Sequence, residues 1–295
     1  MRPKTYDGLP DLTQRLNNFG RWLGSRFERT GSVKDLQTAV EVSERAGKLM
    51  PERYPDLPCS LQNLGSWLNR RYKQSTSAED LERAMRVTQQ AIELTPVDHS
   101  KLSGILSSLW AALHLCSERT GLVQDLDRAI EVIQRAVDAT PDDHPDFAVA
   151  LNNLGRLLRR RFERIGSVDD LNSQLPSYLR SWQCNQARPF IRVHSAQRAA
   201  AIYTFQANWE EASQLLQGAI TVLPKVSPRS LKQPDMQSML ASIPGLASPA
   251  AAIAFNAGVA VTDALSLLEL GRGVISSSLM DIHGDVSHLK GHILF

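Results

Sequence analysis

The chain has 295 residues, of which 42% are hydrophobic and 22% charged, values typical of a chain that folds around a packed core. Its 33 basic and 31 acidic side chains nearly cancel, and only 6% of the residues are aromatic, so neither charge nor base stacking indicates nucleic-acid binding. The three cysteines are odd in number and widely spaced, which argues against a disulfide framework and a zinc site. We therefore expect reduced thiols, a cytoplasmic location, and no cofactor or metal.

Neither end of the chain suggests a membrane segment. The first ten residues, MRPKTYDGLP, contain no apolar run, so we expect no signal peptide. The most apolar stretch, residues 241–268, is interrupted by proline, glycine, asparagine and aspartate. A spanning helix needs about 20 largely uninterrupted apolar residues. We therefore expect packed helices in this stretch.

An internal repeat of 45 residues organises the first half of the chain. The first marker is an Asp-Leu pair, found at Asp35-Leu36, Asp80-Leu81, Asp125-Leu126 and Asp170-Leu171. A second marker, a Leu-rich pentapeptide, keeps the same register: it reads LNNFG from Leu16, LQNLG from Leu61, LSSLW from Leu106 and LNNLG from Leu151. Two independent markers at one interval indicate a true repeat.

Each repeat is expected to form two helices. The first helix shows apolar or small residues at spacings of three and four, and a loop rich in glycine, serine and threonine follows it. The second helix begins near the aspartate of the recurring Asp-Leu pair, whose charge suits a helix N-terminus. It carries two alanines seven residues apart and ends before a proline. These are Ala39, Ala46 and Pro51, then Ala84, Ala91 and Pro96, then Ala129, Ala136 and Pro141.

This pattern resembles the tetratricopeptide repeat. Leu16, Phe19, Gly20 and Leu23 follow the spacing of that family's first helix, while residues 39–51 follow the spacing of its second helix and terminal proline. The longer unit looks like the repeats of kinesin light chain and of fungal multi-repeat proteins. The resemblance implies an all-α fold, a right-handed superhelical solenoid of antiparallel helix pairs.

The regular pattern ends after Leu171, and this gives the expected division of the chain. Residues 1–171 are predicted to hold the 45-residue repeats, and 172–190, with two prolines, to be an irregular linker that breaks the superhelix. The linker indicates either a long loop or a loss of sequence by splicing or a gene-model error. We expect a helix pair of the short tetratricopeptide spacing at 191–224, a linker at 225–246, a last helix pair at 247–282 and a tail at 283–295.

A second resemblance lies in the C-terminal third. The run from Ala264 to Ile275, ALSLLELGRGVI, is similar to the helix that leads into the CHAT domain of fungal repeat proteins, and residues 212–234 are similar to the segment before it. CHAT domains are caspase-like, and active members use a histidine and a cysteine as a protease dyad. The resemblance implies that this chain corresponds to the repeat arm and stops before the catalytic domain. Without that domain, Leu265, Leu268, Val274, Ile275 and Leu279 are expected to be only partly covered, which favours self-association through the C-terminal helices.

No cluster of side chains indicates catalysis. The cysteines, Cys59, Cys116 and Cys184, are expected to be structural, and His99 and His144 occupy equivalent loops, which indicates a packing role. The histidines of the tail, His283, His288 and His292, could bind a metal, but a poorly ordered tail is the simpler interpretation. The isolated Gly271-Arg272-Gly273 is too short for a nucleotide loop.

The first helices are the best candidates for partner binding, because in tetratricopeptide arrays they line the concave face. Asparagine can donate to and accept from a peptide backbone, although it could equally join neighbouring repeats, and arginines that end a helix could simply offset its dipole. The third repeat offers serines instead, so a chaperone-tail clamp is not favoured. The predicted partner-binding residues are Asn17, Asn18, Arg21, Asn63, Arg70, Asn152, Asn153 and Arg156.

The function predicted from the sequence is a non-catalytic scaffold that binds a protein or peptide. The first alternative is an enzyme class: the chain would be the regulatory arm of a CHAT-type cysteine protease. A less favoured alternative is an RNA-reading helical repeat, since the residues at position 17 and its equivalents change from repeat to repeat in a way that only loosely suggests a base code.

Overall fold

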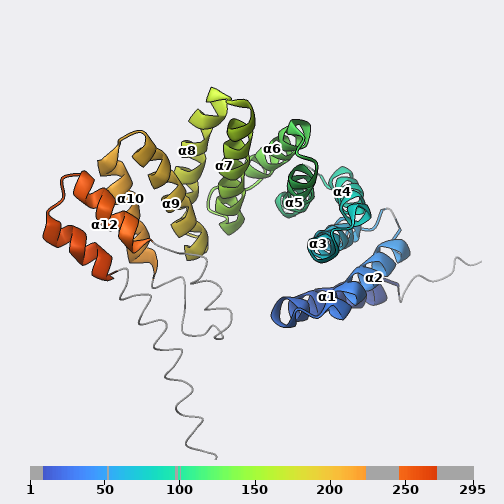
Figure 1. The fold of residues 1–295 in the computed structure, drawn as a ribbon. Helices are drawn as coiled ribbons and strands as arrows, with labels where there is room; N and C mark the ends of the chain where they lie inside the picture. Colours follow the sequence, from blue (N-terminus) through green and yellow to red (C-terminus); the bar gives the residue numbers. More distant parts are fainter. Residues whose placement is uncertain (1–8, 52, 97–98, 100, 224–245, 271–295) are drawn as a thin grey trace, which may run out of the picture. The chain divides into compact units, whose positions relative to one another are not determined.

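Short turns repeat at the 45-residue interval and divide the chain into helices. The structure is a computed structural model that describes residues 9–51, 53–96, 99, 101–223 and 246–270. All regular elements in these residues are helices, so the all-α class is confirmed (Figure 1). The helices are α1 (Leu9–Thr30), α2 (Val33–Leu49), α3 (Leu57–Ser75), α4 (Ala78–Glu93), α5 (Leu102–Thr120), α6 (Val123–Asp138), α7 (Pro145–Ile165), α8 (Val168–Gln183), α9 (Pro189–Phe205), α10 (Trp209–Val222) and α12 (Ala247–Asn256), and residues 261–270 are also helical.

The turn between the two helices of a repeat depends on one residue in the left-handed region. Gly31, Gly121 and Gly166 have φ values of +68°, +72° and +68°, and Thr76 takes the same place in the second repeat with a φ of +55°. The N–H of each of these residues donates to a carbonyl four residues earlier, which closes the end of the first helix. Glycine adopts this conformation without a steric penalty, so Thr76 is the strained member of the series.

An arginine–aspartate pair fastens the end of the first helix to the start of the second. Ser32 caps α2 by accepting a hydrogen bond from the N–H of Asp35, and the Asp35 carboxylate receives the guanidinium of Arg26. This pair holds the pKa of Asp35 below its usual range. The second repeat repeats the pair, because Arg71 Nε donates to Asp80 Oδ2 at 2.8 Å. In these two repeats the aspartate therefore joins the two helices across the turn, and in the first repeat the side-chain cap is Ser32.

Within each pair, the two helices meet through small residues. Ala39, Ala84 and Ala129 are fully buried, as the sequence predicts. The first helix contributes a glycine that faces a residue 23 positions later: a Cβ on Gly20 would lie 2.9 Å from Ser43 Oγ, and a Cβ on Gly65 would overlap the methyl group of Thr88. The side chain from the second helix thus fills the space that the glycine leaves.

The prediction of an irregular linker at 172–190 is wrong. Residues 172–183 belong to α8, which starts at Val168, and α9 begins at Pro189, so only residues 184–188 connect the two helices. The fourth repeat therefore keeps its second helix, and neither a long loop nor missing sequence has to be invoked there. Pro176 lies inside this helix at an exposed position.

Helix α8 forms because its buried positions are filled, although the residue types have changed. Gln174 and Ser181 stand where the other repeats have alanines, and both are buried. Ser181 Oγ donates to the carbonyl of Ala148 at 2.8 Å, which compensates the buried hydroxyl. Tyr178 is fully buried against the glycine of the first helix, since a Cβ on Gly155 would lie 2.6 Å from its ring.

The 45-residue register continues into α9. Ser195 stands 135 residues after Ser60, and both serines accept a hydrogen bond from an asparagine 43 residues earlier. The second helix of this pair, α10, begins at Trp209, four residues sooner than the register gives, because α9 ends early at Phe205. Its buried alanines, Ala212 and Ala219, come seven residues sooner than the register gives. The pair at 191–224 is thus a repeat of the same register with a shortened end.

The chain divides into two compact units, which we describe separately. The first comprises Met1–Pro141 with Leu157–Ser167, and the second Asp142–Arg156 with Val168–Phe295. The core of the first unit gathers leucines, alanines and Trp67 from α1 to α5. The core of the second joins α9, α10 and α12 through residues such as Val193, Leu216 and Ile253. The predicted linker 225–245 and tail 283–295 lie outside the described residues.

Apolar side chains are exposed in the last described helices of the second unit. Phe255, Val261, Leu265 and Leu270 are largely exposed, while Leu267 packs against the core. Val274, Ile275 and Leu279 lie outside the described residues. Self-association through this region stays a prediction. In the described part of the chain, no helix combines the length and the hydropathy that a bilayer-crossing segment requires.

Candidate functional site

Asn17 and Asn152, which hold equivalent positions in their repeats, each join two neighbouring first helices. Asn17 Nδ2 in α1 donates to Ser60 Oγ in α3 at 2.6 Å. In the second unit, Asn152 Nδ2 in α7 donates to Ser195 Oγ in α9 at 2.7 Å. Both donors are therefore engaged within the stack, which is the second of the two roles that the sequence leaves open for asparagine.

The asparagines one position later are accessible. Asn18 is exposed and Asn63 partly exposed, and among the described residues neither amide makes a hydrogen bond. They lie at the same offset in α1 and α3, two first helices that contact each other. In the second unit, Asn153 Oδ1 accepts a hydrogen bond from Arg156 at 3.5 Å. The accessible amides of the first unit are thus Asn18 and Asn63.

The basic residues of this surface differ in their engagement. Arg70 in α3 pairs with Glu28 in α1, and its guanidinium lies 5.4 Å from the centre of the Trp67 ring. Arg70 therefore links two first helices, in addition to its place near the end of α3. Arg21 is exposed on α1, close in sequence to Asn18.

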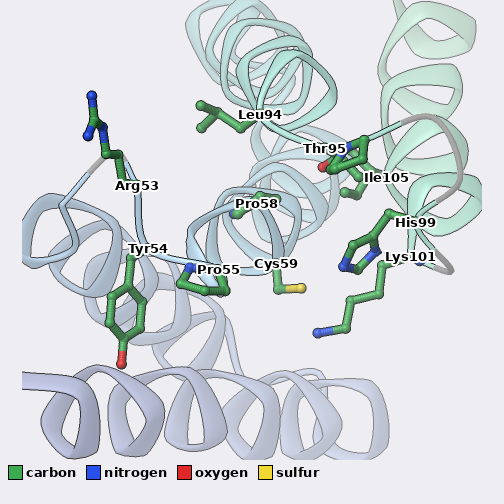
Figure 2. A pocket seen from close by; sticks show the side chains of 11 residues that line it. Arg53, Tyr54, Pro55, Pro58, Cys59, Leu94, Thr95, His99, Lys101 and Ile105 are labelled. Carbon is green, nitrogen blue, oxygen red and sulfur yellow. Dashed lines mark hydrogen bonds between the residues drawn. The ribbon is translucent and has the colours of Figure 1, made fainter.

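A cavity of about 270 Å³ lies in the first unit between two inter-repeat loops (Figure 2). Its walls come from the loop before α3 together with the start of that helix, and from the loop between α4 and α5. Cys59 points toward the side chains of His99 and Lys101, while Arg53 and Tyr54 lie on the opposite side (Figure 2). The complete lining is Arg53, Tyr54, Pro55, Pro58, Cys59, Leu94, Thr95, Pro96, His99, Lys101 and Ile105.

The charge around this cavity is positive. The hydrogen bond with Cys59 is the main cause that raises the pKa of Lys101, and the charge of Asp56, 3.9 Å from Lys101 Nζ, adds to it. Arg53 contributes a second cation, and none of the lining residues is acidic. The cavity is thus suited to a small group that is apolar or negatively charged.

Sequence reasoning assigned no role to this cavity. Cys59 was expected to be a structural thiol, and His99 to pack its loop. The histidines do hold their loops. His99 Nδ1 accepts a hydrogen bond from the N–H of Lys101 at 3.1 Å, and His144 Nδ1 accepts one from the N–H of Asp146 at 3.2 Å. The signal that could have located the cavity is the extra length of the loops that follow Pro51 and Pro96, because these loops form its walls.

The other two cysteines are buried and face acceptors. Cys116 Sγ lies 3.5 Å from Asp125 Oδ2, and burial, followed by the charge of this carboxylate, raises the pKa of the Cys116 thiol. Cys184 Sγ donates to the carbonyl of Asp142 at 3.6 Å. Among the residues that the structure describes, no three His, Cys, Asp or Glu side chains are placed to hold a metal. The tail histidines, His283, His288 and His292, lie outside those residues.

The helix pair that opens the chain matches a known family. Residues 12–46 match the model of the tetratricopeptide repeat. They cover α1 from its second turn and most of α2, so the match spans one pair of helices. This part of the chain is similar to a tetratricopeptide repeat. The 45-residue register relates the following pairs to it, from α3 with α4 onward.

Solved structures support the same fold. A variant of a Podosopora anserina protein described as kinesin light chain nearly identical TPR-like repeats aligns with a TM-score of 0.50 and 18% identity over 71% of this chain and 95% of the other. The unsubstituted protein gives a TM-score of 0.49 over the same shares, again at 18% identity. The protein MamA aligns at 16% identity and a TM-score of 0.45 over 68% of this chain and 93% of the other. No curated protein matches the sequence. At these identities the likeness concerns the fold.

Proposed function

We propose that this chain is a protein-interaction scaffold that holds an extended segment of a partner protein against its first helices. One observation carries this proposal: the amides of Asn18 and Asn63 are accessible, make no hydrogen bond among the described residues and recur at one offset in two adjacent helices. An amide both donates and accepts, so two of them at a fixed spacing suit the alternating N–H and C=O groups of an extended backbone.

The neighbouring residues support this role for α1 and α3. Asn17 is bonded to Ser60 and Arg70 to Glu28, so the two helices are tied together on both sides of the accessible amides. Such ties hold the amides in place before a ligand arrives, which reduces the entropy lost on binding. Arg21 adds an exposed positive charge next to Asn18. In the second unit, Asn153 and Arg156 stand at the equivalent positions.

The proposed function is binding without catalysis in this chain. Tetratricopeptide repeats generally serve as scaffolds, and the described cysteines lie apart from one another in different environments. The alternative, a regulatory arm of a CHAT-type protease, rests on the resemblance of residues 212–234 and above all of residues 264–275. The last five of these residues lie outside the described part of the chain, and no contact of the others favours that function.

The test uses the full chain to select peptides from a random library displayed on phage. We expect selected peptides to bind in an extended form and to lose affinity when both Asn18→Ala and Asn63→Ala are introduced. Each lost side-chain hydrogen bond to a neutral group contributes about 0.5–1.5 kcal/mol, so the double variant should bind roughly tenfold more weakly. The matched control is Gln89→Ala with Gln134→Ala, since these exposed amides are also 45 residues apart but lie on second helices.

Melting temperatures of both double variants should equal that of the unchanged chain, because all four side chains lie outside the core. Equal affinity of the asparagine variant and the unchanged chain would remove the first-helix surface from the proposal. If the glutamine variant loses affinity instead, the second helices form the binding surface.

A further inference from the structure

The outer face of α1 is exposed at positions that are buried in every other repeat of the first unit. Trp22 is 51% exposed, whereas Trp67, 45 residues later, is 8% exposed. Phe19 is 45% exposed against 5% for Leu64, and Leu12 40% against 4% for Leu57. The rings of Phe19 and Trp22 stack on each other at 6.1 Å. The same apolar face that α3 buries is therefore present on α1 and lies open.

The repeat itself shows what covers such a face. Helix α3 packs on α1 and α2, the helix pair that precedes it. Trp67 enters the space left by Gly24 in α1, where a Cβ would overlap its ring. Beside it, Leu61 lies 3.8 Å from the place of a Cβ on Gly47 in α2. The interface between the first and second repeats thus places a tryptophan of the later repeat over a glycine of the earlier one.

We propose that the outer face of α1 is a docking surface for a helix pair of the same repeat type on a partner protein. Trp22 holds the position that Trp67 has in the second repeat, but among the described residues no glycine lies opposite it. The face of α1 is thus the equivalent of the face that α3 buries against the first repeat. The partner must present a small residue at the place of Gly24, so that Trp22 can enter. This surface differs from the asparagine surface proposed above.

One polar residue defines the partner further. Arg15 stands where Ser60 does in the second repeat, and Ser60 is fully buried beneath Asn17 of the preceding helix. Arg15 is exposed and paired with Asp11 within α1 at 2.8 Å. A docked helix pair would bring its own residue 17 equivalent over Arg15. A carboxylate or an amide oxygen at that position satisfies the guanidinium, whereas a lysine or arginine would repel it.

The test supplies the partner as an added copy of the repeat. A duplicate of residues 12–56 is inserted in register before Leu12 of the full chain, so that Gly24 and Asn17 of the duplicate face Trp22 and Arg15. The signal of Trp22 is the difference in fluorescence between each protein and the same protein with Trp22→Phe. We expect the added copy to shift this signal to the blue and to reduce its quenching by acrylamide to the level of a buried tryptophan.

The control carries Gly24→Arg in the duplicate only, which fills the space for Trp22, and its Trp22 should stay open to acrylamide. A folded duplicate that leaves Trp22 as accessible as before would overturn the proposal. So would a duplicate that stays unfolded by circular dichroism, since the same sequence folds in the first repeat. Sedimentation of the unchanged chain is the third measurement. Association that Trp22→Arg abolishes would assign the face to a second copy, whose Gly24 is already filled, and would overturn the requirement for a vacant small residue.

Discussion

The second and fourth repeats build the same helix pair from different residues. In the second, Gly65 of α3 faces Thr88, and the alanines Ala84 and Ala91 allow the helices to approach. In the fourth, Gly155 of α7 faces the large ring of Tyr178. Gln174 and Ser181 occupy the alanine positions of the shared register, and both are buried in α8.

The difference shows that the repeat preserves positions that must be filled, and that the fourth repeat fills them with polar side chains. Ser181 donates to the carbonyl of Ala148, whereas among the described residues Gln174 Nε2 is buried without a hydrogen-bond partner. A buried amide group of this kind costs stability. The second repeat also leaves Trp67 Nε1 and Asn69 Oδ1 without such a partner there, so the clearer difference is that the fourth repeat depends on a single aromatic side chain, Tyr178.

The largest expected effect is that of Tyr178→Ala. Removing a fully buried aromatic ring leaves a cavity and costs about 3–5 kcal/mol. The equivalent change in the second repeat, Thr88→Ala, removes far fewer atoms and should cost clearly less. Urea unfolding followed by hydrogen exchange of α8 measures both. Phe205→Ala, at a side chain that is largely exposed, is the control. Equal costs for Tyr178→Ala and Thr88→Ala would contradict the comparison.

Leucines at one position test whether the two repeats are equally packed along their first helices. Leu61 and Leu151 are both buried, so replacement of either with alanine should cost roughly 2–5 kcal/mol and spread to adjacent repeats. Leu16, the equivalent residue of α1, is only partly buried and should cost less. Chemical denaturation of the three variants gives the order. A loss for Leu16→Ala as large as for Leu61→Ala would show that α1 is covered in solution.

Overpacking distinguishes a glycine that faces a ring from one in open surroundings. A methyl group on Gly155 would press on the Tyr178 ring, so Gly155→Ala should cost about 1–3 kcal/mol. The double variant with Tyr178→Ile should recover part of that loss, because the third repeat has Ile133 at this position. Gly47→Ala is the matched control: its Cβ would meet only Leu61, at 3.8 Å, and the better helix propensity should stabilise α2 slightly. Thermal melts of all three decide the matter.

Substitutions at the left-handed turn residue should change stability less, and in opposite directions in the second and fourth repeats. Thr76→Gly should stabilise the second repeat by about 0.5–1 kcal/mol, since the strain of a β-branched residue at positive φ exceeds the entropy that glycine loses. Gly166→Thr should destabilise the fourth repeat, although a Cβ there would meet no atom within 4 Å. Melting temperatures measure both changes. A loss of stability in Thr76→Gly would mean that the hydrogen bond from its Oγ1 to the carbonyl of Ser75 outweighs the strain.

The smallest energetic effect concerns the cysteines, which report on local exposure without changing stability. Cys59 of the second repeat borders a cavity beside Lys101, whereas Cys184 of the fourth is buried. Iodoacetamide at neutral pH should therefore alkylate Cys59 first. Cys116, whose pKa is raised, should react only on unfolding or at higher pH. Mass spectrometry of peptides locates the label, and early alkylation of Cys184 would contradict the expected order.

The repeats with regular markers could be predicted from the sequence because each helix contact there depends on residue types that recur. Ala39, Gly20 and the turn glycine Gly31 are the residue types that close packing and positive φ require, so their spacing defines the helices. The fourth repeat could not be predicted in this way. Tyr178 and Gln174 fit only because of the neighbours they meet, and a pattern of residue types does not contain those neighbours.

The candidate site was predictable to a similar degree. The offset of Asn18 and Asn63 is visible in the sequence, but their neighbour Asn17 differs in its use, because a serine 43 residues later receives its amide. The cavity beside Cys59 depends on two loops coming together, which the register does not specify. The sequence places Arg70 near the end of a first helix, but its pairing with Glu28 can be predicted only when the neighbouring helices are known.

The early end of α9 suggests how the length of this protein could change in evolution. The buried alanines of α10, Ala212 and Ala219, come seven residues earlier than the 45-residue register gives, and seven residues are close to two turns of a helix. A deletion of that size shortens a helix while returning every later side chain to nearly its former direction. A gene of this type could therefore gain or lose two turns at a helix end and keep its buried positions, whereas a change of two or five residues would rotate the buried face toward water.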